Sequence, residues 1–348
     1  MHPLVVTFLL SALGLGTVLT FSSSHWLLAW MGLEMNTLAI LPLMAQKHHP
    51  RGAEAATKYF LIQATAAAMI MFASLINAYA GGGWSICQSI DPIAGTIFVL
   101  ALALKMGLAP VHFWLPEVLQ GLDLTTGLVL STWQKLAPFA LIVQVAESLD
   151  SSIITWLGGI SIAVGGWGGL NQTQLRKLLA YSSIAHFGWM VLIIQYSRTI
   201  GLVALFMYVA MVSAAFLALK AYNCTTLNSL ATSWGKSPGV GTILLPTMLS
   251  MAGLPPLSGF LIKWGMIREL TMQGLPFPSL VAALFGLLSL FYYLRVCYAV
   301  ALTTAPNVPI SCAPWRLRPF RGYLFLAVTS TIAVGSLPLT PAILALFT

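Results

Sequence analysis

Residues 101–111, ALALKMGLAPV, decide the fold of this chain, because they place a lysine, a glycine and a proline inside an otherwise apolar stretch. The apolar run Pro92–Ala109 has the length and composition of a transmembrane helix. Gly107 and Pro110 break that helix. A charged side chain such as Lys105 costs about 2.5–3.5 kcal/mol at this depth on insertion scales. The stretch therefore predicts a membrane helix that is interrupted beside a buried lysine.

A second segment, residues 253–263 with the sequence GLPPLSGFLIK, repeats this pattern. Gly253 and the prolines after it interrupt another long apolar run, and Lys263 follows the break. The two breaks lie five predicted spans apart, and an odd separation reverses the direction of the second helix. In transporters, interrupted helices of inverted repeats lie near the membrane midplane, where a polar cavity satisfies the freed backbone groups. We therefore expect two inverted repeats, each with one broken helix.

The composition predicts an all-α polytopic membrane protein. Of 348 residues, 58% are hydrophobic and 7% are charged, whereas soluble domains carry about 25% charged residues. The apolar runs are continuous and do not alternate, which disfavours a β-barrel. We predict eleven spans: Pro3–Phe21, His25–Ala45, Ala56–Ala80, Pro92–Ala109, Leu124–Ala146, Ser151–Leu170, Leu178–Tyr196, Thr199–Ala221, Gly239–Leu270 (interrupted), Leu275–Leu302 and Gly322–Phe347.

The loop charges indicate the orientation in the membrane. The basic residues after even-numbered spans are Lys47, Arg51, Lys58, Arg176, Lys177, Lys236, Arg316, Arg318 and Arg321. The loops after odd-numbered spans carry Asp91, Glu147, Asp150 and Glu269, with Arg198 and Arg268 as their bases. Basic loops stay on the inner face, so the N-terminus is expected there and the C-terminus on the outer face. The net charge of +8 is scattered through short loops, and this distribution argues against nucleic-acid binding.

The residue pattern contains no site for electrons, nucleotides or metals. The cysteines Cys87, Cys224, Cys297 and Cys312 form no CxxC pair, so a site with cysteine ligands alone is excluded for iron–sulfur clusters and disfavoured for zinc. Paired intramembrane histidines that could ligate haem are missing, as are P-loop and Rossmann fingerprints. We expect no cofactor in this chain, and energy for any pumping must come from elsewhere.

The main candidates for proton transfer are four ionisable residues in otherwise apolar stretches, namely Glu34, Lys105, Lys135 and Lys263. Burial disfavours the charged form of an amine, so such lysines can take up and release protons. We expect Glu34 to pair with Lys105, and their approach and separation to act as a proton-release switch. Two other interpretations remain open: lysines near helix ends can extend to the interface, and a buried pair can be a static ion pair.

Two histidines are further candidates for proton transfer. His112 lies in the polar stretch Pro110–Asp123, which we expect to be a proton entry path or a solvated loop. Glu117 and Asp123 in the same stretch fit a solvated loop better. His186 follows two serines in the predicted span Leu178–Tyr196, where it is either a relay group or a hydrogen-bonded packing residue.

Several long motifs resemble one known family. They are SHWLLAWMGLE at 24–34, ALKMGLAPVHFWLPE at 103–117, LSTWQKLAP at 130–138, LLAYSSIAH at 178–186 and GLPPLSGF at 253–260. Together they resemble the mitochondrially encoded NADH dehydrogenase subunit 2 family of respiratory complex I, and the likeness extends over essentially the whole chain. This family belongs to the antiporter-like subunits of the complex.

The resemblance implies a layout and a set of roles. Two inverted five-helix repeats are implied in residues 1–147 and 148–303, with a loop and a C-terminal transmembrane helix in 304–348. Bacterial relatives carry three further N-terminal helices, so this chain is implied to start at their fourth. The implied proton path contains the pair Glu34 and Lys105, the connecting Lys135, the terminal Lys263, and the polar residues His112 and His186.

The resemblance also implies the partners and the location of the chain. The implied function is proton translocation coupled to electron transfer from NADH to ubiquinone. NADH, FMN, iron–sulfur clusters and ubiquinone are expected in other subunits. The expected partners are other membrane-arm subunits, including neighbouring antiporter-like subunits, and lipids such as cardiolipin. The expected location is the mitochondrial inner membrane, with the N-terminus on the matrix side and the C-terminus on the intermembrane-space side.

Two alternative functions fit the same residues. A free-standing cation/proton antiporter has a similar fold and lysine relay, but it pumps when purified alone in liposomes. A purely architectural subunit tolerates the loss of Lys135 without loss of turnover. A haem-bearing cytochrome is disfavoured by the histidine count.

Overall fold

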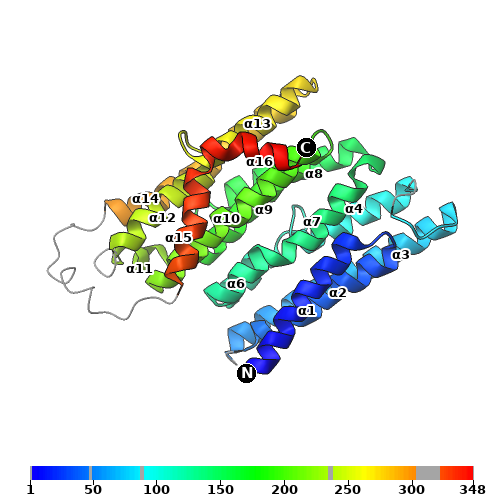
Figure 1. Cartoon of the computed structure of the whole chain (residues 1–348), viewed down its shortest axis with the longest axis horizontal. Helices are drawn as coiled ribbons and strands as arrows, with labels where there is room; N and C mark the ends of the chain where they lie inside the picture. Colours follow the sequence, from blue (N-terminus) through cyan, green and yellow to red (C-terminus); the bar gives the residue numbers. More distant parts are fainter. Residues whose placement is uncertain (1, 47–48, 87–89, 234–237, 303–321, 348) are drawn as a thin grey trace. The chain divides into compact units, whose positions relative to one another are not determined.

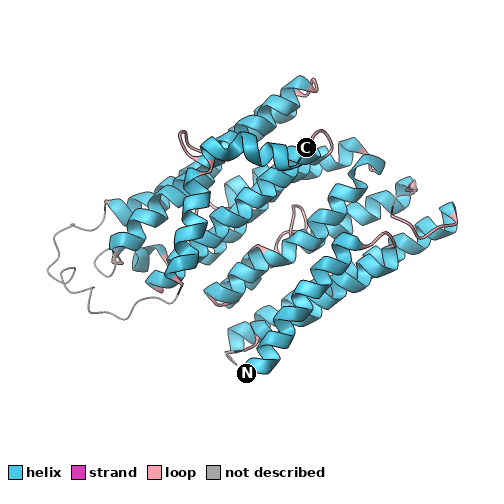
Figure 2. Ribbon diagram, viewed as in Figure 1, coloured by secondary structure: helices cyan, strands magenta, loops and turns pink. Residues whose placement is uncertain are grey.

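The computed structural model describes residues 2–46, 49–86, 90–233, 238–302 and 322–347. Within these ranges the regular structure is helical, apart from two isolated β-bridges (Figure 2). Several residues that the sequence analysis used lie outside the described ranges: Lys47, Cys87, Lys236, Cys312, Arg316, Arg318 and Arg321, together with most of the predicted loop that begins at residue 304.

The chain forms two compact units, residues 1–158 and 159–348. The first contains α1 (Pro3–Ser22), α2 (Trp26–Met44), α3 (Pro50–Gly81), α4 (Pro92–Met106), α5 (Trp114–Gly121), α6 (Leu124–Ser131), α7 (Trp133–Val145) and η1 (Ala146–Ser148) (Figure 1). Helix α8 (Ser151–Gly168) runs across the boundary. The second contains α9 (Leu175–Ile194), α10 (Arg198–Tyr222), α11 (Leu227–Ala231), α12 (Pro238–Ala252), α13 (Ser258–Met272), α14 (Pro276–Ala301), α15 (Tyr323–Gly335), η4 (Leu337–Leu339) and α16 (Thr340–Phe347).

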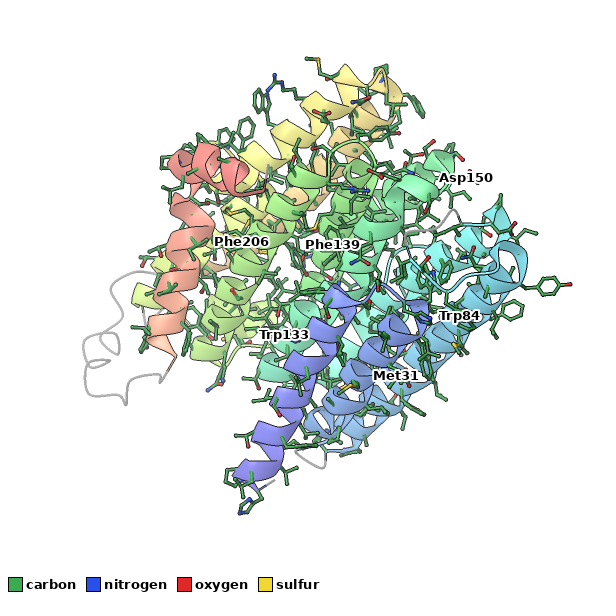
Figure 3. All side chains as sticks on the ribbon, turned by 45° about the vertical axis from the view of Figure 1, so that its right-hand side comes forward. Met31, Trp84, Trp133, Phe139, Asp150 and Phe206 are labelled. Carbon is green, nitrogen blue, oxygen red and sulfur yellow. The ribbon has the colours of Figure 1, made fainter. Side chains whose placement is uncertain are left out.

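The helices have the length and surface of membrane spans. Among the described residues, 7 helical segments are long and apolar enough to cross a membrane, and three further apolar helices are shorter. Large apolar side chains such as Met31 and Phe206 lie exposed on the helices (Figure 3). Exposed apolar side chains are what a lipid-facing surface requires, so the predicted all-helical membrane protein is confirmed at this level.

Helices α1 and α2 pack closely through two glycines. A Cβ atom added at Gly16 would lie 2.8 Å from the carbonyl oxygen of Gly32, and one added at Gly32 would lie 2.8 Å from that of Gly16. Small residues at such a crossing let the backbones of membrane helices approach each other. The close approach fixes α2, which carries Glu34, against α1.

The two predicted helix breaks are present. Helix α4 ends at Met106 and α12 ends at Ala252. Gly107 and Gly253 follow them with φ angles of 75° and 81°, values that favour glycine. Each break also contains a cis X-Pro bond, Ala109–Pro110 in the first and Pro255–Pro256 in the second.

Two details of the predicted helices are wrong. The stretch after the first break contains helix α5, where a polar loop was expected, because Trp114–Gly121 has a strongly amphipathic pattern. The predicted span Leu124–Ala146 is confirmed as one apolar helical segment, Leu124–Ser148, with an irregularity at Thr132. The predicted C-terminal helix is interrupted between α15 and α16 by η4, whose proline lacks a backbone donor.

Candidate functional site

The interrupted end of α4 is stabilised by side chains from other helices. Nε1 of Trp114 in α5 donates to the carbonyl of Leu104 at 3.0 Å, and Nε2 of Gln63 in α3 donates to the carbonyl of Lys105 at 3.4 Å. The backbone N–H of Leu108 donates to Ala103 at 2.9 Å. A helix end leaves its last carbonyls without helical partners, and lipid offers none. These donors therefore hold the backbone beside Lys105 in place.

We expect Trp114→Phe to destabilise this end of α4. The change keeps an aromatic ring but removes the Trp114 donor to the carbonyl of Leu104, which keeps the 3.2 Å bond from the N–H of Gly107. Losing one hydrogen bond costs about 0.5–1.5 kcal/mol. The thermal inactivation midpoint of the membrane-bound protein should fall. Trp156→Phe is a suitable control because Trp156 is 68% exposed, and it should leave the midpoint unchanged. Equal midpoints for the two variants would contradict this account of the break.

A polar cavity in the first unit brings two of the predicted lysines together. Lys105 and Lys135 are 5% and 2% exposed, and both line the cavity. The cavity is wide enough to admit water. Its lining consists of Leu33, Asn36, Thr37, Tyr59, Gln63, Lys105, Trp114, Leu130, Gln134, Lys135 and Pro138.

Glu34 interacts with Lys105 electrostatically but does not form a direct hydrogen bond with it. The carboxylate of Glu34 exerts a Coulomb attraction on the Lys105 amine. Oε2 of Glu34 and Nζ of Lys105 are both buried and have no hydrogen-bond partner among the described residues. The side-chain amide of Asn36, which lines the same cavity, is likewise buried without a partner in the part of the chain that the structure describes. Buried polar atoms of this kind are typically satisfied by water.

The three lysines occupy different positions on their helices. Lys105 lies in the last turn of α4, and Lys135 is the third residue of α7. In the second unit, Nζ of Lys263 donates to the carbonyl of Ala252 at 2.8 Å, at the end of α12, and reaches that of Met251 at 3.5 Å. The C-terminal end of a helix stabilises a cation, whereas the N-terminal end opposes one. Lys135 follows the irregularity at Thr132, where the carbonyl end of α6 lies directly before α7, so no isolated helix end acts on this lysine.

A second cavity, within the second unit, is lined by His186 and Lys263. Nε2 of His186 shares a hydrogen bond of 3.3 Å with the hydroxyl of Tyr293, and its ring contacts Tyr208 with centroids 5.7 Å apart. The remaining lining residues include Met190, Met211 and Met266. His186 thus combines a hydrogen-bond partner with access to the cavity of Lys263.

His112 lies in the break between α4 and α5. It is 5% exposed, and its Nδ1 lies 3.2 Å from the carbonyl oxygen of Pro110. Its ring packs on Phe113 with centroids 4.3 Å apart. The histidine is therefore buried, where the sequence left open a solvated loop.

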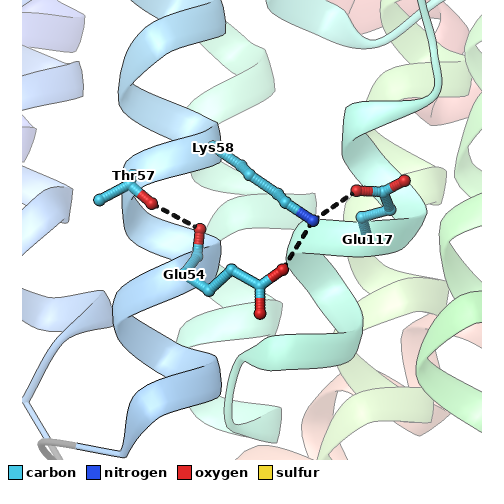
Figure 4. Close-up of polar contacts among 4 residues, drawn as sticks. All are labelled: Glu54, Thr57, Lys58 and Glu117. Atoms are coloured by element: carbon cyan, nitrogen blue, oxygen red, sulfur yellow. Dashed lines mark hydrogen bonds and ion pairs between the residues drawn. The ribbon is translucent and has the colours of Figure 1, made fainter.

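Glu117 joins α5 to α3 through an exposed ion-pair cluster. Nζ of Lys58 lies 2.9 Å from Oε2 of Glu117 and 2.8 Å from Oε1 of Glu54 (Figure 4). Exposed ion pairs contribute little to stability. This cluster offers an exposed lysine, in contrast to the buried Lys105 and Lys135.

Sequence reasoning missed the uncharged polar residues around these lysines. Gln134 donates through Nε2 to the carbonyl of Asn36 at 3.1 Å, and the hydroxyl of Tyr59 lies 3.5 Å from Oε1 of Gln134. Gln63 and the tyrosines near His186 were missed as well. The available signal was an amide or a phenol inside an apolar span, but such residues are common enough in membrane helices that they indicate a site only when the fold brings them together.

Comparison with known proteins identifies the family. Residues 23–289 match the family model described as NADH:quinone oxidoreductase/Mrp antiporter, TM, and residues 290–344 match NADH dehydrogenase subunit 2 C-terminus. The NADH-ubiquinone oxidoreductase chain 2 of Salmo salar is 62% identical over 348 residues, which cover 100% of both chains.

Solved structures share the fold. A chain of respiratory complex I from Thermus thermophilus has a TM-score of 0.81 and 31% identity, over 97% of this chain and 80% of that chain. A chain of the Mrp complex from a Dietzia species has a TM-score of 0.83 over 94% of this chain and 74% of that chain; at 18% identity this likeness concerns the fold alone. The all-helical architecture is thus an antiporter-like membrane fold. The chain is 62% identical to a relative over its full length, and it matches both family models. It therefore belongs to the family of NADH-ubiquinone oxidoreductase chain 2.

Proposed function

We propose that this chain is a membrane-arm subunit of respiratory complex I. In this role it contributes to proton translocation across the inner mitochondrial membrane, coupled to electron transfer from NADH to ubiquinone. The family membership supports the assignment to the complex. The observation that carries the proton-transfer role is the cavity of the first unit, in which two buried lysines face polar side chains.

Glu34, Lys105 and Lys135 form the proton path of the first unit. Burial opposes the ammonium form of Lys105, and the Coulomb attraction of Glu34 favours it. Lys135 is 2% exposed, and its burial disfavours a permanent charge there. In this proposal a proton on Lys105 passes to Lys135, through water in the cavity, when the attraction of Glu34 weakens.

His186 and Lys263 form the corresponding path of the second unit. Lys263 is held by the carbonyls at the end of α12, which stabilise its ammonium form. His186 lines the same cavity and can accept a proton at one nitrogen while releasing one from the other. His112 is proposed as a further polar group of the path, beside the break of α4.

The remaining parts of the proposal concern the assembly. We place the redox chemistry in other subunits, which bind NADH, FMN, iron–sulfur clusters and ubiquinone. The partners of this chain are the neighbouring antiporter-like and other membrane-arm subunits, and lipids such as cardiolipin. Residues 1–147 and 148–303 are proposed as inverted five-helix repeats within eleven spans, with the N-terminus in the matrix. The positive loop charges support this orientation.

The Glu34–Lys105 pair provides the experiment that tests the proposal. We expect Glu34→Gln and Lys105→Met, each in the assembled complex in sealed membrane vesicles, to lower NADH-driven proton translocation about tenfold. Losing about 1.4 kcal/mol of coupling between the charges corresponds to a tenfold change in rate. Lys105→Arg distinguishes a proton-release switch from a static ion pair, because arginine stays charged and cannot release its proton. If the pair is a switch, this variant should assemble normally but fail to pump protons.

Lys58→Met is the matched control, since Lys58 is an exposed lysine in an ion-pair cluster. It should leave translocation unchanged. Normal pumping by Lys105→Met would favour an architectural subunit. Normal pumping by Lys105→Arg would make the pair a static one. Cation-dependent proton transport by the purified chain alone in liposomes would favour a free-standing antiporter.

A further inference from the structure

The side-chain amide of Asn36 in α2 is buried beside the lysines of the first unit. Asn36 is 2% exposed and lines the cavity that also contains Lys105 and Lys135. Neither Nδ2 nor Oδ1 of its amide forms a hydrogen bond within the described ranges of the chain. An unsatisfied buried polar group costs about 1–3 kcal/mol. Because the cavity admits water, water is the partner that this position offers to the amide.

Two other helices of the first unit fix the position of this amide. A Cβ atom added at Gly16 in α1 would lie 3.0 Å from Cγ of Asn36, so the amide packs directly against the backbone of α1. Gln134 in α7 donates through Nε2 to the backbone carbonyl of Asn36 at 3.1 Å. A polar group that is held in this way can orient a reacting molecule without first losing conformational freedom. The amide is therefore a fixed hydrogen-bonding group at the wall of the cavity.

A second buried asparagine of the same unit has a different environment. Asn77 in α3 is also 2% exposed, but its Oδ1 accepts a hydrogen bond of 3.1 Å from the backbone N–H of Asp91, directly before α4. Its amide thus joins two helices, which is a structural role. The amide of Asn36 makes no such link among the residues that the structure describes. This contrast favours a role for Asn36 in the cavity.

We propose that Asn36 is a positioning residue, which holds the water through which a proton passes from Lys105 to Lys135. The inference rests on the proposed function, because it needs the two lysines to exchange a proton. A buried water typically makes about three hydrogen bonds. The two amines supply two of them, and the amide of Asn36 supplies the third. None of the roles assigned to the charged residues includes this amide.

The transfer conserves every proton. The ammonium group of Lys105 donates a proton to the water, and the same water releases one of its own protons to the neutral amine of Lys135. At the end Lys105 is a neutral amine, Lys135 is an ammonium and the water is again a water. The total charge is the same before and after the step. Asn36 neither gains nor loses a proton, since an amide acts here only through hydrogen bonds.

Asn36→Ala in the assembled complex tests the inference, because it removes the amide without adding bulk beside Gly16. We expect NADH-driven proton translocation per assembled complex, in sealed vesicles, to fall about tenfold, which corresponds to about 1.4 kcal/mol in the barrier. The ratio of the translocation rates in H₂O and D₂O should rise, because proton transfer through the water becomes rate-limiting. A parental rate or an unchanged isotope ratio would overturn the inference.

Asn77→Ala is the matched control, since it removes a buried amide that has a protein partner. It should lower the amount of assembled complex at most, and the complexes that do assemble should translocate protons at the parental rate with the parental isotope ratio. A rise of the isotope ratio as large as that of Asn36→Ala would show a general effect of losing a buried amide, and would overturn the inference.

A map of the assembled parental complex that resolves water gives a test without any variant. We expect an ordered water within hydrogen-bonding distance of both the Asn36 amide and the amine of Lys105 or Lys135. This test decides the question even if Asn36→Ala does not assemble. An amide whose donors and acceptor all bond to protein groups, of this chain or of a neighbouring subunit, would overturn the inference.

The outcomes also separate this inference from the proposed function. A parental rate for Asn36→Ala together with a slow Lys105→Met variant would reject the positioning role and leave the proton path intact. Parental translocation by both Lys105→Met and Lys135→Met would reject the path of the first unit itself, and the role of Asn36 with it.

Discussion

Gly259→Ala should prevent the assembly of this subunit into a stable complex. Gly259 is the second residue of α13, and its Cα lies directly against the carbonyl group of Ser250 in α12. An added Cβ would overlap that carbonyl oxygen, and backbone atoms on both sides prevent relief by a side-chain movement. We expect a cost above about 4 kcal/mol, the range reached by severe overpacking in a core. The measurement is the amount of assembled complex in membranes, separated by native electrophoresis.

Gly265→Ala in the same helix is the matched control. A Cβ atom at Gly265 would meet nothing within 4 Å, and alanine favours a helix interior over glycine by about 1 kcal/mol. This variant should assemble at the parental level. Normal assembly of Gly259→Ala would mean that α12 and α13 can move apart to accommodate a methyl group. This result would contradict the claim that the two helices pack rigidly beside the second break.

The two helix breaks could be predicted because their cause is local. A glycine that ends a helix, followed two or three residues later by proline, limits the backbone whatever surrounds it. The residues after each break could not be predicted equally well. Helix α5 is only 8 residues long, and its polar positions resemble those of a loop until α3 supplies the ion-pair partner Lys58 for Glu117.

The charged residues of the candidate site could be predicted from the sequence, since a lysine in an apolar run has a high free-energy cost in the membrane. Their partners could not be predicted. Gln63 belongs to the site because α3 places its side-chain amide beside the backbone carbonyl of Lys105. Tyr293 belongs to it because α14 packs near α9 and places its hydroxyl beside His186. The irregularity at Thr132 was missed as well, because no glycine marks it. Lys135 lies within one turn after it, inside the predicted span.

That position leads to the second large effect, which is expected for Lys135→Met. Methionine fills similar space but cannot hold a proton, so the path between Lys105 and the far side of the cavity is interrupted. A positioned proton-transfer group contributes about 10²–10⁴-fold, and we expect proton translocation to fall at least about a hundredfold. Lys135→Arg should fail as well, because arginine remains charged and cannot release a proton to the next group.

The measurement is the proton yield per NADH oxidised in sealed vesicles, with assembly verified by native electrophoresis. Lys135 is 2% exposed, so the arginine variant has to fit a larger group in the same cavity, and the methionine variant controls for assembly. Lys58→Met should retain the parental yield. A parental yield for Lys135→Arg would show that this amine never needs to release its proton. The path would then have to bypass Lys135.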